Sequence, residues 1–229
     1  MHIQAVKVQR LYLQVARQLQ DLIAAGTFQV GERLPSERDL AGQFAVSRPT
    51  IREAMIALEI SGTVEVRSGS GVYVLPQAGN PETLAETQGP GPFEILEARK
   101  LIEAETCALA AQRINPEQLG QLQLLLEEMA KENRQQDSTE QADEKFHCLI
   151  ADASGNSALS ATISWLWQLR NESDISTHFH HRVRNEGTRP ILKDHQAILA
   201  ALRKGDANAS RRAMTRHLQR VIDHLMEAM

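Results

Sequence analysis

The spacing of apolar residues predicts three short helices at the start of this 229-residue chain. Apolar positions recur every three or four residues between Leu11 and Ala25, and Gly26 follows them as a helix terminator. Ser36 and Ser47 each precede a further apolar stripe and have the hydroxyl side chain that helix N-caps prefer. The stripe after Ser47 ends before another glycine, which closes the third predicted helix.

After these helices the pattern changes from a helical period to alternation. Apolar and polar residues alternate over 63–67 and 72–75, on either side of the segment Ser-Gly-Ser-Gly. Two short alternating runs around a glycine-rich turn predict a hairpin of two strands. A helix, two further helices in tight succession and a hairpin are the elements of a winged helix-turn-helix, which we expect within residues 1–76.

Proline and glycine accumulate over 77–92, where neither a continuous helix nor a central strand can form. We interpret this stretch as a linker between two domains. Over 93–229 the apolar residues again follow a helical period, and no alternation persists. The expected fold class is therefore mostly α, with an N-terminal winged helix-turn-helix followed by an all-helical antiparallel bundle of six or seven helices.

The helix that begins at Ser47 has the residues of a DNA-reading helix. Its first turn presents arginine and hydroxyl side chains, and the first turn of such a helix enters the major groove. Arginine binds guanine bidentately there, and hydroxyls bind phosphate oxygens. Isolated arginines on a small helical domain are usually solvated charges, but the order of the elements favours DNA. The residues expected to contact DNA are Arg38, Ser47, Arg48, Thr50, Arg52, Ser68 and Gly69.

Composition argues against several other classes of protein. The net charge of −4 says nothing about DNA binding, so the local arrangement of arginines has to carry that expectation. Aromatic residues make up 4% of the chain, which argues against an aromatic platform for single-stranded nucleic acid. Cys107 and Cys148 lack CxxC spacing, so we expect neither a disulfide framework nor a thiolate zinc site. Without an apolar run long enough for a membrane or a signal-peptide pattern, the protein is expected in the cytoplasm, with no membrane partner.

Four ionisable residues lie on the apolar stripes of the second domain. Asp143 and His147 are one helical turn apart, and His195 and His217 each share an apolar face on a later predicted helix. Neutral imidazoles and a carboxylate suit zinc, nickel, manganese or iron(II). A single histidine of this kind is more often a hydrogen-bonded core residue, but three such helices can close around one cation. We therefore predict a divalent metal site, with zinc as the expected ion and nickel or manganese as alternatives.

Two arginines are candidates for binding an organic anion. Arg99 lies on an otherwise apolar helix face, where a guanidinium must be paired. Its partner is either a ligand carboxylate or an internal acid such as Glu103, and the sequence leaves both open. Arg170 follows two tryptophans and could line the same cavity. Both arginines are therefore predicted effector-binding residues.

Further histidines accompany these candidates. His178, His180 and His181 form a cluster that lacks an apolar period and precedes a glycine and a proline. We interpret this cluster as a loop near the pocket rather than as a metal site. His224, further along the helix of His217, is the main alternative to it as the fourth metal ligand.

The first part of the chain resembles the winged helix-turn-helix of the GntR family. The segment RLPSERDLAGQFAVSRPTIREAMIALEISGTVEVRSGSGVYV carries the resemblance through its L-P-S-E-R, V-S-R-x-T-x-R-E-A and G-S-G-V-x-V motifs. This resemblance implies the following DNA contacts: Arg38, Arg48, Thr50, Arg52 and Gly69.

The rest of the chain resembles the FCD ligand-binding domain, which follows the GntR reader in the FadR subfamily. The matching segments are EARKLIEAETCALAA, DEKFHCLIADASGN, DHQAILAALRKGD and AMTRHL. Metal-binding members use an Asp-x3-His pair and two later histidines, and these fall on Asp143, His147, His195 and His217. Within the subfamily, GPFEILEARKLIE and the later W-x-x-R resemble regulators of hexuronate catabolism. The resemblance therefore implies a uronate or aldonate effector.

The expected function is a DNA-binding transcription regulator and not an enzyme. We expect a homodimer that represses genes of sugar-acid catabolism and leaves its double-stranded operator when a small carboxylate such as a hexuronate binds at the metal-containing pocket. Three alternatives stay open: the metal is itself the signal, the metal is purely structural, or the site activates water for hydrolysis. No nucleophile motif supports the hydrolase, which would also leave the DNA-reading helices unexplained.

Overall fold

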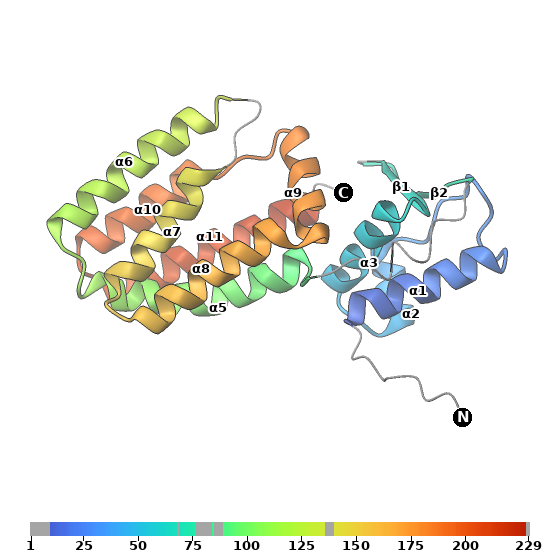
Figure 1. The fold of residues 1–229 in the computed structure, drawn as a ribbon, viewed down its shortest axis with the longest axis horizontal. Coiled ribbons are helices and arrows are strands. Elements are labelled where there is room, and N and C mark those ends of the chain that lie inside the picture. The colour runs from blue at the N-terminus through green and yellow to red at the C-terminus, as the bar shows by residue number, and fades with distance from the viewer. Residues whose placement is uncertain (1–9, 68, 77–83, 85–88, 136–139, 228–229) are drawn as a thin grey trace. The chain divides into compact units, whose positions relative to one another are not determined.

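The computed structural model describes residues 10–67, 69–76, 84, 89–135 and 140–227 (Figure 1). These residues form two compact units, which are described one at a time. The first holds the described residues up to Phe93 together with Ser173–Phe179. The second holds the described residues of Glu94–Glu172 and His180–Glu227.

The N-terminal unit begins with three helices and a hairpin. Helix α1 spans Leu11–Ala24, α2 spans Glu37–Phe44 and α3 spans Arg48–Ile60. The hairpin pairs β1 (Val64–Arg67) with β2 (Gly71–Val74) in an antiparallel sheet. This order of elements is the predicted winged helix-turn-helix, so this part of the fold prediction is confirmed.

Side-chain caps and a left-handed residue fix the turn between α2 and α3. Ser36 Oγ accepts a hydrogen bond from Asp39 N, and Ser47 Oγ accepts one from Thr50 N, each at 3.2 Å. Ala45, directly after α2, is left-handed with φ 53°, which reverses the chain within a few residues. The first turn of α3 therefore begins at a defined place, with Ser47 on the surface.

The core of this unit lies where α1 packs on α3 and the hairpin closes one end. Each large apolar side chain buried there stabilises the fold by about 1.5–3 kcal/mol. The amphipathic stripes read from the sequence supply these side chains: Tyr12, Val15, Leu19, Ile51, Met55, Leu58, Val64 and Val74. The polar start of α3 is left outside this core.

The rest of the described chain is helical. Seven helices whose bounds lie in the described residues follow the hairpin, at the upper end of the predicted six to seven, and the predicted fold class is confirmed. Their bounds are Pro92–Ala111 for α5, Pro116–Glu132 for α6, Gln141–Ala153 for α7, Ser157–Glu172 for α8, Asp174–Asn185 for α9, Leu192–Arg203 for α10 and Ala207–Glu227 for α11.

Helix α9 corrects the sequence interpretation of the clustered histidines. His178, His180 and His181 lie inside this helix and not in a loop. The apolar period is present but sparse, because Ile175, Phe179 and Val183 recur every fourth residue among polar ones. All three of those side chains are buried, so the stripe suffices to hold a helix.

Polar side chains tie the end of α6 to the start of α7. Both carboxylate oxygens of Glu132 on α6 accept from Ala142 N on α7, at 3.2 and 3.3 Å. Glu132 therefore caps the N-terminus of α7 from a neighbouring helix. Asn133 Nδ2 donates to Pro190 O at 2.9 Å, which fixes the connection that precedes α10. Glu140, the N-cap of α7, is left-handed with φ 56°, and its side chain makes no capping hydrogen bond. The Glu140 carboxylate therefore turns away from the helix end.

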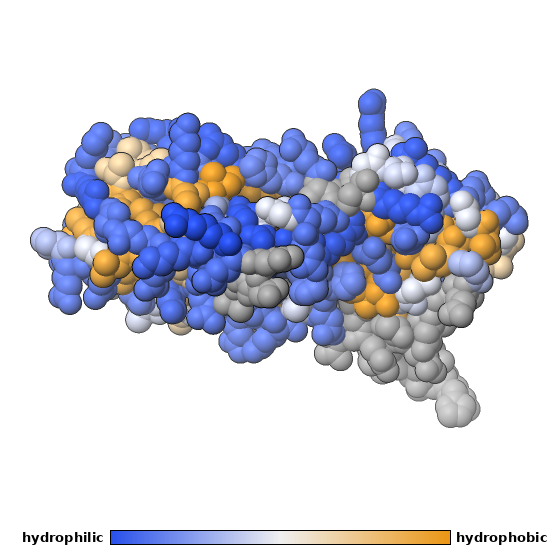
Figure 2. Space-filling model, turned by 90° about the horizontal axis from the view of Figure 1, so that it is seen from above, coloured by the Kyte–Doolittle hydropathy of each residue, from blue (hydrophilic) through white to orange (hydrophobic). Residues whose placement is uncertain are grey.

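The face of the molecule in Figure 2 is mostly hydrophilic, with hydrophobic patches between the polar side chains. Large exposed apolar residues include Leu124 on α6 and Trp165 on α8, which are 59% and 55% exposed. No helix in the described part of the chain combines the length and the apolar character that crossing a membrane requires.

Candidate metal centre

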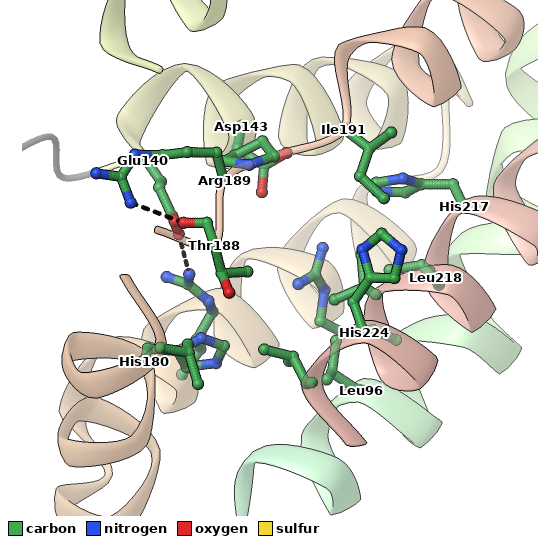
Figure 3. A pocket seen from close by; sticks show the side chains of 16 residues that line it. Leu96, Glu140, Asp143, His180, Thr188, Arg189, Ile191, His217, Leu218 and His224 are labelled. Carbon is green, nitrogen blue, oxygen red and sulfur yellow. Dashed lines mark hydrogen bonds and ion pairs between the residues drawn. The ribbon is translucent and has the colours of Figure 1, made fainter. Parts of the chain in front are cut away.

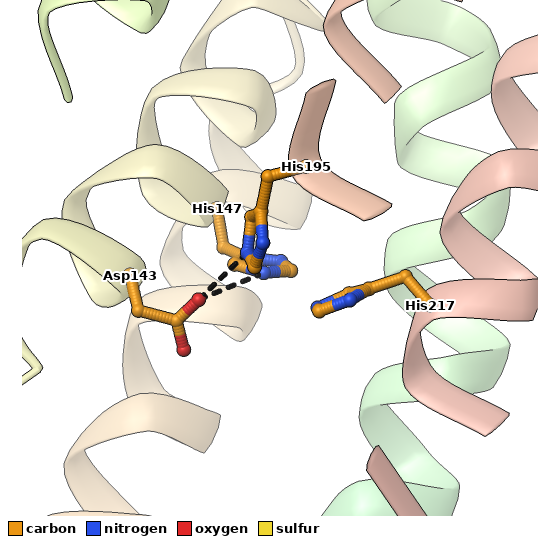
Figure 4. A group of neighbouring side chains, drawn as sticks. All are labelled: Asp143, His147, His195 and His217. Atoms are coloured by element: carbon orange, nitrogen blue, oxygen red, sulfur yellow. Dashed lines mark ion pairs between the residues drawn. The ribbon is translucent and has the colours of Figure 1, made fainter. Parts of the chain in front are cut away.

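Four side chains from three helices converge in the second unit. Asp143 and His147 come from α7, His195 from α10 and His217 from α11 (Figure 4). Each offers one oxygen or nitrogen atom, and these atoms all lie within 4.8 Å of one another. The three imidazoles are buried. The structure thus brings together the four residues that the sequence singled out as metal ligands.

Polar atoms of this cluster point at one another without forming hydrogen bonds. Asp143 Oδ1 lies 2.7 Å from His195 Nε2 and 3.8 Å from His147 Nε2. The shorter contact lacks hydrogen-bond alignment, and all three atoms are buried without a hydrogen-bond partner. Burying such an atom unpaired costs about 1–3 kcal/mol. A carboxylate oxygen and imidazole nitrogens are donors to zinc and related ions, so the residues present fit a divalent cation.

The outer nitrogen of His147 is held by a buried carboxylate that the sequence suggested only as a partner for Arg99. Glu103 accepts from His147 Nδ1 on one side and from Arg99 Nε, at 2.6 Å, on the other. Burial alone would raise the pKa of Glu103, but Arg99 and His147 lower it to about 2, so it stays ionised. A carboxylate behind a histidine fixes the ring orientation and leaves Nε2 to face the cluster.

The other two imidazoles also have an oxygen atom behind Nδ1, which is a hydrogen-bond partner for His195 but too distant for His217. His195 Nδ1 donates to Ile191 O at 3.0 Å, and His217 Nδ1 faces Asp194 Oδ2 at 3.9 Å. Arg220 Nη1 donates to the other oxygen of Asp194 and holds that carboxylate in place. Burial, and then the neighbouring His195, lowers the pKa of His217 to about 3. His217 is therefore neutral near pH 7, the form in which an imidazole binds metal.

We expect Glu103→Gln to weaken metal binding by about 10- to 100-fold, because the amide is a weaker acceptor for His147 Nδ1 than the carboxylate. A chelator competition titration with zinc measures this affinity. Glu105→Gln is the matched control, since Glu105 lies on the same helix but pairs with Arg211 at the surface. Equal zinc affinities in the two variants would exclude the orienting role of Glu103.

A pocket opens beside the metal cluster (Figure 3). Asp143 and His217 belong to both, so a molecule in the pocket would reach the cluster. Arg99, Arg170 and Arg189 also line the pocket and give it a positive wall. The apolar part of the lining consists of Leu96, Val183, Pro190, Ile191, Leu218, Val221 and Leu225. Guanidinium groups beside an apolar surface can bind a small organic anion.

The two arginines predicted to bind an effector both border this pocket and both are paired within the protein. Arg99 forms the internal ion pair with Glu103 and lies 3.9 Å from the ring centre of Trp167. Arg170 Nη2 donates to Glu140, whose carboxylate also lies 3.3 Å from Arg184 Nη2. Sequence reasoning missed Glu140, because it stands in a polar stretch where no apolar period marks it.

The additional histidines divide between the pocket and the surface. Within α9, His180 lines the pocket, while His178 and His181 do not, and His224 lines it outside the metal cluster. Burial, and then Arg170 and Arg99, holds the pKa of His180 well below its usual range. The nearby guanidinium groups thus add to the effect of burial in keeping His180 neutral.

The predicted DNA-reading residues lie mostly on the surface of the first unit. Arg38, Ser47 and Arg48 are exposed at the starts of α2 and α3. The hydroxyls of Ser47 and Thr50 lie 2.7 Å apart, so the α3 cap is an ordered pair. Gly69 at the wing is left-handed with φ 71°. Ser68 is outside the described residues.

Arg52 does not fit the direct DNA contact predicted for it. Its side chain is 3% exposed and bonds bidentately to Glu37 on α2, with Nε–Oε1 and Nη2–Oε2 distances of 2.6 and 2.8 Å. One turn of α3 carries residue 52 from the exposed position of Arg48 to the face that packs on α2. The guanidinium therefore joins the two helices of the reader and does not face solvent.

Comparison with known proteins places the two parts of the chain in known domain families. Residues 11–74 match the family described as bacterial regulatory proteins, gntR family, and residues 94–220 match the FCD domain. The chain is 39% identical to the Uxu operon transcriptional regulator of Escherichia coli K12, over 97% of this chain and 90% of that protein. It is 36% identical to the Exu regulon transcriptional regulator of the same strain, over 92% and 82%. The solved structure of E. coli McbR/YncC, 24% identical, has a similar fold, with a TM-score of 0.51 over 96% of this chain and 99% of that one.

Proposed function

The chain belongs to the gntR family of bacterial regulatory proteins and is a transcription regulator with an FCD domain, and from this premise we propose that it represses operons of sugar-acid catabolism until a hexuronate binds. The observation that carries the proposal is the Asp/His cluster that borders an arginine-lined pocket. The relatives named for the Uxu operon and the Exu regulon support the sugar-acid class.

Asp143, His147, His195 and His217 would hold the metal ion. When bound, the ion supplies a positive charge that attracts a carboxylate and the hydroxyl next to it, with zinc as the proposed ion and nickel or manganese as alternatives. Arg99 and Arg170 line the pocket, each paired with an acid of the protein, and would donate hydrogen bonds to the bound acid. The apolar residues of the lining exclude water from these contacts.

The first turn of α3 would read the operator DNA. Arg48 and Ser47 are exposed there, and the wing carries Gly69 nearby in sequence. Regulators of this type bind double-stranded DNA as homodimers, with two recognition helices about 34 Å apart. Binding of the effector would favour an arrangement of the two readers that cannot fit successive major grooves. Emptying a mostly occupied operator requires a preference of about 5 kcal/mol for that arrangement.

A thermal-shift titration of the purified protein against D-glucuronate and D-galacturonate tests the proposal. We expect each active acid at 100 times its dissociation constant to stabilise the protein by about 2.7 kcal/mol, and a chelator to abolish the gain. Glucose, which lacks the carboxylate, is the control and should have no effect. A shift with zinc alone and none with either acid would contradict the sugar-acid effector and would favour the metal as the signal or as a structural ion.

DNA binding is measured separately, on operator sequences selected in vitro by the wild-type protein. We expect the active hexuronate to lower the affinity for the selected sequence in the presence of zinc. Identical affinities with and without the acid would exclude the coupling between pocket and reader, even if the acid binds.

A further inference from the structure

The carboxylate of Glu140 lies among arginines on one side of the pocket. The Glu140 side chain is 12% exposed, accepts a hydrogen bond from Arg170 Nη2 and lies 3.3 Å from Arg184 Nη2. Figure 3 shows Glu140 and His217 on opposite sides of the pocket. Glu140 is therefore placed to meet the end of a ligand that points away from the metal cluster.

Two other acids near the pocket, Asp143 and Glu103, have different partners. Asp143 is the other carboxylate among the described residues that line it, and Asp143 belongs to the metal cluster. Glu103 lies behind Arg99 and neutralises that guanidinium. The countercharge of Arg170 and Arg184 is thus supplied by Glu140. A neutral side chain at position 140 would leave two guanidinium groups without this partner beside the cavity.

Glu140 and the arginines suit different chemical groups on a ligand. A carboxylate accepts hydrogen bonds from sugar hydroxyls and repels a second carboxylate, whereas an arginine without a countercharge attracts one. We propose that Glu140 is a specificity-determining residue, which makes the pocket accept sugar acids with one carboxylate and reject the corresponding diacids. This inference rests on the proposed function, in which the single carboxylate is drawn to the metal side.

The test compares three ligands with the same six-carbon chain, of which one has a carboxylate at both ends. D-galacturonate and D-galactonate have one carboxylate, galactarate has two, and galactonate controls for the open-chain form. Isothermal titration of the zinc-loaded full-length protein measures each affinity in the wild type, in Glu140→Gln and in Glu144→Gln. Glu144 is the matched control, because it lies on the same helix and accepts from Asn171 Nδ2 at 3.0 Å outside the pocket lining.

We expect the wild type to bind at least one monoacid about tenfold or more tighter than galactarate, because like charges in close contact are strongly unfavourable. Glu140→Gln should reduce that ratio at least about tenfold, mainly through tighter galactarate binding, while Glu144→Gln should leave it unchanged.

The outcomes separate the two proposals. If the wild type binds galactarate as well as the monoacids, Glu140 does not discriminate, whatever the variant does, and the acid effector stands. If Glu140→Gln keeps the wild-type ratio, the assignment of Glu140 fails and the acid effector again stands. If the wild type binds none of these acids, and none of the hexuronates of the thermal-shift titration, both proposals fail together.

Discussion

His217→Ala is expected to abolish stoichiometric zinc binding, whereas His224→Ala is expected to keep it. Both histidines lie on α11 and border the pocket, but only His217 belongs to the cluster of four. Loss of an orienting residue behind a ligand already costs about 10- to 100-fold in metal affinity, so loss of the ligand should cost more than about 100-fold. Metal analysis of the purified variants and a chelator competition titration measure the difference.

This pair of variants also tests which histidine completes the site. His224 is exposed and offers a second imidazole on the same helix, so the sequence alone left it as an alternative ligand. Zinc retained by His217→Ala and lost by His224→Ala would reverse the assignment. Because removing a buried imidazole also leaves a cavity, the melting temperature of each variant is measured in chelator, where only packing differs.

Arg52→Ala is expected to destabilise the DNA-reading unit by about 3 kcal/mol. The substitution removes a buried guanidinium that bonds bidentately to Glu37. The Glu37 side chain, which is 15% exposed, keeps its longer contact to Arg48 at 3.7 Å. This remaining contact places the expected loss at the lower end of the range for broken buried ion pairs. Hydrogen exchange measured by mass spectrometry on α2 and α3 localises the loss of protection to this unit.

Arg48→Ala is the matched comparison for Arg52→Ala. Arg48 is 56% exposed on its side chain, so its removal should change stability by no more than about 0.5 kcal/mol. If Arg48 contacts a base, DNA affinity should nevertheless fall by about 1–3 kcal/mol. Weakened DNA binding by Arg52→Ala at full stability would instead make Arg52 a direct contact and contradict the role assigned here.

The sequence predicted the metal cluster because each ligand leaves a signal of its own. An ionisable residue on an apolar stripe is unusual, and Asp143 and His147 are also spaced by one helical turn. The winged helix-turn-helix was predictable for a similar reason, since caps and glycines mark the ends of its elements. In both cases the information is local, within one helix or one turn.

The residues that the sequence did not reveal depend on contacts between distant segments. Arg48 and Arg52 are both arginines and lie four positions apart. Packing against α2 buries Arg52, whereas Arg48 stays exposed. Glu140 becomes part of the pocket only because α8 and α9 bring Arg170 and Arg184 to it. No spacing rule within one helix predicts such pairs. The stripe of α9 was read as a loop for a different reason, because its apolar residues are sparse among polar ones.

The left-handed backbone of Glu140 has a consequence for attempts to stabilise the protein. Glycine and asparagine adopt φ near 56° at lower cost than glutamate, for which this conformation costs about 1–2 kcal/mol. Neither Glu140→Gly nor Glu140→Asn is expected to raise the melting temperature, because each also removes the carboxylate that pairs with Arg170 and Arg184. Breaking a buried ion pair costs about 3–5 kcal/mol, which exceeds the strain that would be relieved. A selection for heat resistance is therefore expected to leave position 140 unchanged, with its strained backbone retained for the sake of the ion pairs.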